Sequence, residues 1–548
     1  MRSAHLVPRR DVLKALVGLG GLGLLAACSG ATPAAPAGTA GPAVGSKPAA
    51  PPAAAGTPRR GGILNGVQQN NWESFDPHRI TSSAAASPEI YDTLVEWRVQ
   101  PDGTLAAAPA LAISWELKDE SATFTLRQGV KFHDGSDWNA DVAKYNIERL
   151  KDARSTARAF VDPITSAEVV DPYTLRLKLS APAGSLLSNL SQSADARTYI
   201  ISKEMAEKAG DKYGSSPETT AGSGPMKLVE WVSGSHHTVQ RTGSHWQMGA
   251  DNQSLPYLDT LKIRFVADDA VRFVELRSGN ADVIDNVQAK DVPTGQQDPG
   301  IDLVENPYQV SAYQFNFSAS NGPFVDNLKL RQAVHYAIDR EAVARVLGQS
   351  IGAPMYYFLA PGYLGFDDSL PHYTFDPARA RQLLAEAGYP GGVDIQISTI
   401  NRAVDQQQAQ ILKQMLGEVG IRANLDVLER IAWTDKMATG QYEMGTFFTT
   451  MRPDPDSILA GRFESKQGKN YAQMSDQVMD QLLAKGRSSY DDAVRAAAYR
   501  EVQQRIFDTA WYGTIWYRKY FDGYRKQVQG RLRTQEPGWN LRSAWLSA

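Results

Sequence analysis

The chain has 548 residues, a formal net charge of −3 and one cysteine. Residues 1–27 carry a net charge of +3, so the remainder carries about −6. A mildly acidic chain without basic runs argues against a nucleic-acid partner. One cysteine excludes an intramolecular disulfide framework and a multi-thiolate metal site. The length allows two or three domains with sizeable cores.

The N-terminal residues have the pattern of a bacterial export signal. A basic head at Arg9-Arg10 precedes an uncharged stretch, too short to span a bilayer, and small residues then lead to Cys28. The arginine pair with Leu13-Lys14 resembles a twin-arginine (Tat) signal. A cysteine at this place resembles a bacterial lipobox. We therefore expect residues 1–27 to be a signal peptide and Cys28 to carry the lipid.

The segment after this cysteine has the composition of a tether. Residues 28–60 are almost entirely Ala, Pro, Gly, Thr and Ser, so they cannot bury apolar area. We expect a disordered linker that holds a lipoprotein on the extracytoplasmic face of the cell membrane, in the periplasm or at the cell surface.

A β-α-β-α-β unit is predicted between residues 376 and 448. Asp376 before Pro377 predicts a helix N-terminus, and Gly388 predicts the end of that helix. Alternating strands separated by amphipathic helices indicate a parallel sheet. The expected strands cover residues 393–397, 421–427 and 444–448, with helices over 377–387, 412–419 and 433–437. One further continuous helix is expected over residues 330–347, ended by Gly348.

The remaining segments favour two α/β domains with an insertion. Short strands at 122–126 and 174–179 among Asp-Pro and Asp-Gly turns predict an extra α+β domain over residues 96–217. This insertion interrupts lobe I, which is expected to consist of residues 61–95, 218–308 and 510–548. Lobe II is expected to consist of residues 309–509. The chain is expected to cross between the lobes near residues 309 and 509.

Several motifs between residues 61 and 545 occur in the order found in one known family. They are FTLRQGVKFHDG at 124–135 followed by ADV at 140–142, GSGP at 222–225, RTGSHW at 241–246, LRSGNADV at 276–283, LRQA with YAIDR within 330–340, and DP with EAGY within 376–389. This order resembles the family 5 extracellular solute-binding proteins, the dipeptide-, oligopeptide- and nickel-binding receptors of ABC importers. The resemblance implies an α/β, two-lobed periplasmic-binding-protein-like fold of type II, with an extra α+β domain in the larger lobe.

The resemblance also implies a function. It predicts a receptor that captures a small organic solute, peptide-like by family default, between its lobes and delivers it to the permease subunits of an ABC transporter. A binding protein of this kind is expected to be a monomer without catalytic activity or cofactor. A peptide, an oligosaccharide, an opine and a metal chelate all stay open as solutes. The alternative is a surface lipoprotein that acts as a chaperone for unfolded peptides, and a secreted hydrolase is a more distant one.

Candidate ligand-binding residues follow from the same resemblance. They lie after the first strand, at the crossover between lobes, and in the second lobe. The candidates are Asn71, Trp72, Tyr313, Trp433, Phe448, Met451, Arg452 and Asp454. Each is also compatible with a place in a core.

Met451 stands where the peptide receptors of the family have an aspartate that pairs with the α-amino group of the peptide. Alignment on the Asp454-Pro455-Asp456 turn places it there, and places Phe448 at a family Trp position. A buried ammonium without a carboxylate costs several kcal/mol, so free-amine peptides lose their anchor. Arg452, if it faces the cleft, favours an anionic or polyhydroxylated group. The alternative is that the alignment slips and one of the two aspartates of the turn takes this role.

Metal and enzyme signals are weak. His133 reads as part of a tight turn in which Gly135 has positive φ. His236 and His237 are neighbours on a predicted strand and therefore point to opposite faces, which argues against a paired metal site. The acids of residues 454–456 are expected to be solvated or capping rather than catalytic. The chain has no zincin motif, nucleophile elbow or phosphate-binding loop.

Overall fold

The structure, a computed structural model, describes residues 56–80, 88–99, 105–192, 197–452, 454–531 and 539–547. All of them belong to one compact unit, Lys47–Ala548. The predicted signal peptide, Cys28 and most of the predicted linker lie outside the described residues. Across the described ranges, no helix has both the length and the hydropathy needed to cross a bilayer.

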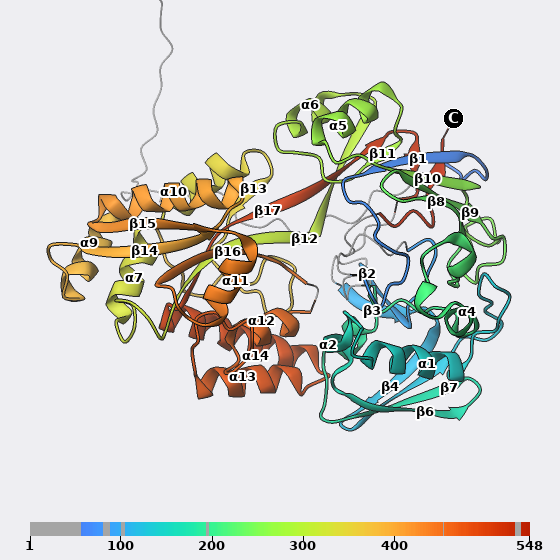
Figure 1. Ribbon diagram of the computed structural model, residues 1–548, viewed down its shortest axis with the longest axis horizontal. Helices are drawn as coiled ribbons and strands as arrows, with labels where there is room; N and C mark the ends of the chain where they lie inside the picture. The colour runs from blue at the N-terminus through green and yellow to red at the C-terminus, as the bar shows by residue number, and fades with distance from the viewer. Residues whose placement is uncertain are drawn as a thin grey trace, which may run out of the picture. The chain divides into compact units, whose positions relative to one another are not determined.

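One large mixed sheet runs through this unit (Figure 1). Its strands in spatial order are β15 (Ile421–Leu428), β14 (Val393–Ile400), β16 (Met444–Thr450), β12 (Ile301–Phe317), β17 (Tyr512–Arg525), β11 (Val283–Ile284), β1 (Ile63–Gln68), β10 (Thr260–Phe265), β9 (His236–Arg241) and β8 (Met226–Val232), with β13 (Gly352–Pro354) beside β17. Strands β15, β14 and β16 form the sheet of lobe II. Strands β11, β1, β10, β9 and β8 form that of lobe I.

Two long antiparallel strands, β12 and β17, join the lobes. Residues 301–306 of β12 pair with residues 520–525 of β17 on the lobe I side, and residues 310–316 pair with residues 512–519 on the lobe II side. A register shift separates Asn306 from Val310. Figure 1 shows both strands running from the group that contains α5 and α6 to the group that contains α10 and β14.

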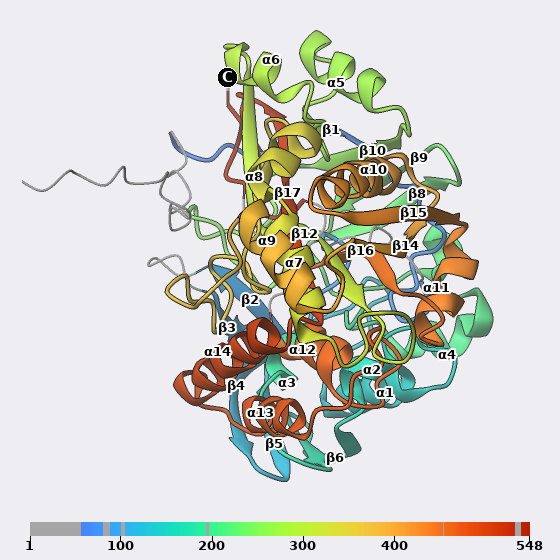
Figure 2. The same cartoon turned by 90° about the vertical axis from the view of Figure 1, so that its left-hand side faces the viewer.

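Lobe II contains the predicted β-α-β-α-β unit. Strand β14 pairs in parallel with β15 and with β16. Helix α9 begins at Pro377 with the Asp376 carboxylate accepting the Arg379 N–H, and Gly388 takes a φ of +97° just after it ends. These features are confirmed. The helices are α7 (Leu328–Ala337), α9 (Pro377–Glu386), α10 (Ala403–Glu418), α11 (Arg430–Ala438), α12 (Asp456–Phe463), α13 (Gln477–Arg487) and α14 (Asp492–Thr509). Figure 2 shows α7 beside α9, which it contacts.

The single helix expected over residues 330–347 is wrong. Helix α7 ends at Ala337, and α8 (Arg340–Val343) and a π-helical turn (Ala344–Gly348) follow. Asp339 has an extended backbone and its carboxylate accepts the Ala342 N–H, so it caps a new helix. The buried Arg340 guanidinium then donates to the carbonyl oxygens of Thr514 and Tyr373. An apolar period does not reveal such an interruption.

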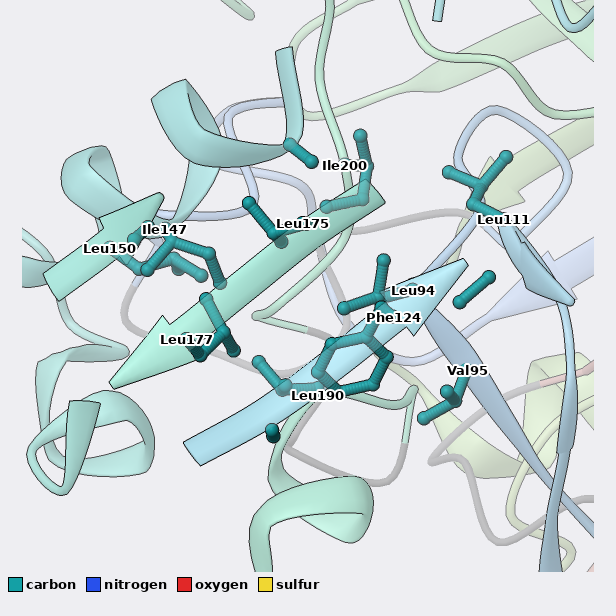
Figure 3. Packing of buried hydrophobic residues seen from close by; sticks show 14 of the residues in the cluster. Leu94, Val95, Leu111, Phe124, Ile147, Leu150, Leu175, Leu177, Leu190 and Ile200 are labelled. Carbon is teal, nitrogen blue, oxygen red and sulfur yellow. The ribbon is translucent and has the colours of Figure 1, made fainter. Parts of the chain in front are cut away.

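The extra α+β domain is built on a second, antiparallel sheet. Its order is β4 (Ala112–Lys118), β5 (Ser121–Leu126), β7 (Thr174–Leu179) and β6 (Ile164–Asp171), beside the hairpin β2 (Val95–Val99) and β3 (Leu105–Pro109). Helices α1 (Ala140–Lys151), α2 (Arg158–Val161) and α3 (Leu186–Asn189) accompany it. Figure 3 shows Phe124 at the centre of its core, near Leu94 and Leu190. The turn at Gly135 has a φ of +91°, as predicted.

The cores differ from the expected domain limits in two places. The sequence predicts that residues up to 217 belong to the extra domain. In the structure, however, the lobe I core around Leu64 also contains Tyr199, Ile201 and Tyr213. Helix α4 (Lys203–Ala209) lies in this segment. Likewise, the chain does not leave lobe II at residue 509, because the side chains at positions 512, 515 and 516 pack in lobe II cores. On β17 the crossing lies instead near residues 519–520, opposite the register shift.

Two neighbouring carboxylates near this crossing, Asp522 and Asp285, lower the stability of the native state at high pH, because burial raises the pKa of both, that of Asp285 to about 6. Burial and the neighbouring Asp285 carboxylate raise the pKa of Asp522, on β17, to about 8. The Asn286 N–H donates to Asp522 at 3.2 Å. An unfolded aspartate has a pKa of about 3.9. The native state therefore holds this proton more tightly, and its stability falls as pH rises from about 4 through about 8.

We predict that Asp522→Asn, which keeps an acceptor for the Asn286 N–H, raises the melting temperature above pH 8 and leaves it nearly unchanged near pH 4. Thermal unfolding at both pH values measures this. Asp394→Asn, at an exposed carboxylate, is the control. An equal effect of Asp522→Asn at both pH values would show that the carboxylate at position 522 is not protonated in the native state.

Candidate solute-binding site

A cavity of about 850 Å³ lies at the carboxyl ends of the three parallel strands of lobe II. Ile400 ends β14, Arg430 follows β15 and Thr450 ends β16, and all three line the cavity. Asn70, which follows β1 of lobe I, and Arg197 line it as well. The carboxyl edge of a parallel sheet is the usual place for a ligand because successive loops converge there. The wall thus combines residues from both sides of the β12–β17 crossing.

The alternation of β16 explains which of its side chains are accessible. Successive strand residues point to opposite faces. Phe447 is buried and packs near Trp433 and Tyr471, whereas Phe448 is half-buried. Thr450, the last residue of the strand, is exposed. Strand β16 therefore contributes the rings of Phe447 and Phe448 and the exposed hydroxyl of Thr450 to the lining of the cavity.

Three of the predicted ligand-binding residues, Trp433, Phe448 and Arg452, line the cavity. Trp433 lies on α11 and meets the Tyr471 ring edge-on at 5.5 Å. The Arg402 guanidinium lies 4.1 Å from the centroid of the Phe448 ring. Arg452 lies over Phe160 of the extra domain at 5.1 Å, so it links the loop after β16 to that domain.

Tyr313 lies behind this wall. It belongs to β12, just past the register shift, and its ring stacks on Trp516 of β17 at 4.2 Å with an interplanar angle of 4°. Its other neighbour is Phe448, at 6.1 Å. The tyrosine side chain is 5% exposed and does not line the cavity. The structure places it as a support for the aromatic wall.

Asn71 and Trp72 lie outside the cavity wall, where the preceding residue Asn70 is found instead. The Asn71 side chain accepts the Gly234 N–H. Trp72 is buried in the lobe I core against the ring of His237, at 4.0 Å. The chain thus turns from the cavity wall toward the lobe I core after Asn70.

Met451 and Asp454 also lie outside the cavity wall. Met451 is buried in a lobe II core, and its N–H donates to the Val310 carbonyl at 2.8 Å. Asp454 is buried and accepts from Arg495 at 2.7 and 2.8 Å. Asp456 pairs with Arg487 at 3.3 Å. Burial raises the pKa of Asp456 to about 6, although Arg487 opposes this.

Of the two roles expected for these acids, solvated or capping, the first is wrong because both are buried, whereas Asp454 does accept the Asp456 N–H at 3.0 Å at the start of α12. They hold α12 to α13 and α14, because both guanidinium partners, Arg487 and Arg495, come from those helices. A carboxylate already paired in a core has no open face for a solute ammonium. Met451, which stands at the family aspartate position, therefore points into the protein. Asp454 and Asp456, the two acids that might have replaced that aspartate, do so as well.

Of the cationic side chains that form the main charged feature of the wall, sequence reasoning named only Arg452. Five cationic side chains line the cavity: Arg197, Arg430, Arg452, Arg462 and Lys469. Arg462, on α12, has its guanidinium carbon 4.8 Å from the ring centroids of both Phe447 and Tyr471 and donates to the Thr449 hydroxyl at 3.1 Å. Arg430 was accessible to prediction because it follows a parallel strand. Arg462 was not, since its ring partners come from distant segments.

His133 and His237 are part of the packing and hydrogen bonding of the protein interior. The His133 ring hydrogen-bonds to backbone at both nitrogens: Nδ1 accepts the Gly222 N–H, and Nε2 pairs with the Gly224 carbonyl. Burial lowers the pKa of His133 to about 4. His237 is fully buried, and burial lowers its pKa to about 3, while His236 points to the other face of β9. Within the described ranges, no group of three or more His, Cys, Asp or Glu side chains is arranged to hold a metal ion.

Two lobes joined by two strands, with a cavity that draws on both, define a solute-binding receptor. The model of the bacterial extracellular solute-binding proteins, family 5, matches residues 106–470, and the chain belongs to this family. Its members are binding receptors of ABC importers for peptides or related solutes, not enzymes.

Comparisons with individual proteins agree. The chain is 28% identical to glutathione-binding protein GsiB of Shigella dysenteriae over 496 residues, which cover 87% of this chain and 93% of that protein. It is 27% identical to the dipeptide-binding protein of Escherichia coli K12 over 498 residues, 84% and 90% of the two chains. The structure of HbpA2 from Haemophilus parasuis superimposes with a TM-score of 0.80 at 23% identity, over 89% of this chain and all of that one. The predicted family and two-lobed fold are confirmed.

We predict that Met451→Asp lowers the free energy of unfolding by roughly 3 kcal/mol or more, because it buries a carboxylate without a partner. It should not create affinity for Ala-Ala, since the side chain faces the core. Thr450→Asp, at the exposed neighbour, should change stability by only about 0.5 kcal/mol. Urea unfolding and calorimetry measure both effects. A stable Met451→Asp variant that binds Ala-Ala would place residue 451 in the solute site.

Proposed function

We propose that this protein is a lipid-anchored receptor that captures a small organic solute in the cavity between its lobes and delivers it to an ABC permease. The observation that carries this proposal is the composition of the cavity wall, in which Asn70 of lobe I faces residues at the carboxyl edge of the lobe II sheet. A solute bound there touches both lobes and so stabilises their closed arrangement. Relatives named for glutathione and for dipeptides support a peptide-like or related solute.

The proposed domain limits follow the packing. Lobe I takes residues 61–93, 197–306 and the C-terminal residues from 520, the extra domain takes residues 94–192, and lobe II takes residues 310–519. The proposed hinge is the pair of strand segments around residues 307–309 and 519–520, where the ladder of β12 and β17 changes register. We further propose that the receptor acts as a monomer.

Closure is the test of this proposal. Cys28 is the only cysteine, so Cys28→Ala combined with Ser233→Cys and Thr439→Cys places one label on each lobe, at exposed residues that do not line the cavity. We predict that a small-molecule extract of the source cells shortens the distance between the labels, measured by electron spin resonance or fluorescence transfer. A control pair at Lys413 and Thr439, both exposed in lobe II, should not change. Unchanged distances in both pairs would contradict a receptor that closes on a solute.

The anchor has a separate test at Cys28, which lies outside the described residues. We predict that the wild-type chain stays with the membrane fraction after a high-salt wash, because two or three acyl chains hold a protein firmly. Cys28→Ala should appear in the soluble extracytoplasmic fraction. Retention of Cys28→Ala on washed membranes would show that another element attaches the protein.

A further inference from the structure

We infer that the cavity selects a small solute with two or more anionic oxygen groups, rather than a free-amine peptide. This inference rests on the proposed function, since it names the solute class for the same site. Its starting point is the charge of the wall: five lining side chains are cationic, and no Asp or Glu is present among the described residues that line it. Cations that face one cavity, without acidic neighbours in the wall, attract and orient anions.

Arg462 is the preorganised member of this set. Its guanidinium packs against the rings of Phe447 and Tyr471, which lie nearly perpendicular to each other, and donates to the Thr449 hydroxyl. In the described parts of the chain, no carboxylate forms an ion pair with it, although most arginines in the neighbouring helices have one. A fixed guanidinium fork matches the geometry of a carboxylate or a phosphate group.

Arg430 supplies a second, independent cation. It is the first residue of α11, at the helix end where backbone N–H groups also favour negative charge. The Glu429 side chain does not cap this helix, because it accepts from the Asn401 amide instead. Arg430 is exposed and lines the cavity. Two cations on different elements, α11 and α12, can engage two anionic groups of one solute.

Trp433 indicates that a hydrogen-bond acceptor completes the site. It is 5% exposed and lines the cavity, and its indole Nε1 is buried without a hydrogen-bond partner among the described residues. Buried N–H groups are almost always paired, so an orphan donor in a binding wall marks a place for a ligand oxygen. An anionic solute offers such oxygens, whereas an ammonium offers only donors.

The site also lacks what a free amine needs. Met451 and both acids of the following turn face the core, and the acids are paired with Arg487 and Arg495. An ammonium group in this cavity would meet cations without a compensating carboxylate from the described wall. The chemistry therefore favours polycarboxylates or phosphate monoesters and disfavours zwitterionic dipeptides.

Equilibrium dialysis against a defined mixture tests this inference. The mixture contains citrate, succinate, glucose 6-phosphate, glucose, Ala-Ala and putrescine, and mass spectrometry measures what the full chain retains. We expect retention of citrate or glucose 6-phosphate above all others; which of the two is retained separates a carboxylate from a phosphate site. Arg462→Gln and Arg430→Gln should each weaken that retention about 10-fold or more. Arg422→Gln, at an exposed lobe II arginine paired with Asp394, should leave it unchanged.

The outcomes separate this inference from the receptor function. Preferential retention of glucose, Ala-Ala or putrescine overturns the anion selectivity and leaves the receptor intact. Anion retention that survives both Arg462→Gln and Arg430→Gln places the anion elsewhere and also overturns the inference. If no anion is retained although the extract closes the labelled lobes, the receptor function is supported and the inferred class of solute is contradicted. If neither retention nor closure is observed, the receptor function and the inferred class of solute are both contradicted. Arg430→Gln changes an exposed side chain, so its result does not depend on folding.

Discussion

The pairing of β12 with β17 is the constraint on which the rest of the structure depends. These are the strands of the described chain that belong to the ladders of both lobes, and β12 pairs with β16 on one side while β17 pairs with β11 on the other. Any change in the angle between lobes has to be absorbed where their register shifts. The cavity lies beside this crossing, because Thr450 of its wall pairs with Ser311 of β12, so a solute that bridges the two walls would act directly on the proposed hinge.

Aromatic packing fixes the lobe II side of the crossing. The stack of Tyr313 on Trp516 joins the two strands just past the register shift, and the Trp516 indole N–H donates to Gln408 of α10 at 2.9 Å. Phe448 continues this aromatic layer to the cavity wall. The wall is thus supported by the same residues that hold the two strands together.

The charges of lobe II are divided between core and cavity. The acids after β16 are buried and paired with arginines of α13 and α14, where losing one partner would leave an uncompensated buried charge. Arg462, six residues after Asp456 on α12, is paired with rings and a hydroxyl instead. This division leaves positive charge at the cavity, so that one helix, α12, contributes to the core and carries a residue of the proposed solute site.

Local patterns in the sequence predicted much of this fold. The cap at Asp376, the helix end at Gly388 and the parallel strands β14 to β16 depend on neighbouring residues and were predicted correctly. The helix break at Asp339 and the place of residues 512–516 depend on distant partners and were not. At the site, Trp433, Phe448 and Arg452 were predicted, but the direction of Met451 and the ring pair around Arg462 follow from contacts between segments that periodicity does not reveal.

The most direct measurement of the central claim is a crystal structure of the protein with its retained solute. The account predicts that the solute lies at the carboxyl ends of β14, β15 and β16, touches Asn70 from lobe I, and places an anionic group against the Arg462 guanidinium. A solute found outside this cavity, or one whose ammonium group is held by Asp454 or Asp456 after repacking of α12, would contradict it.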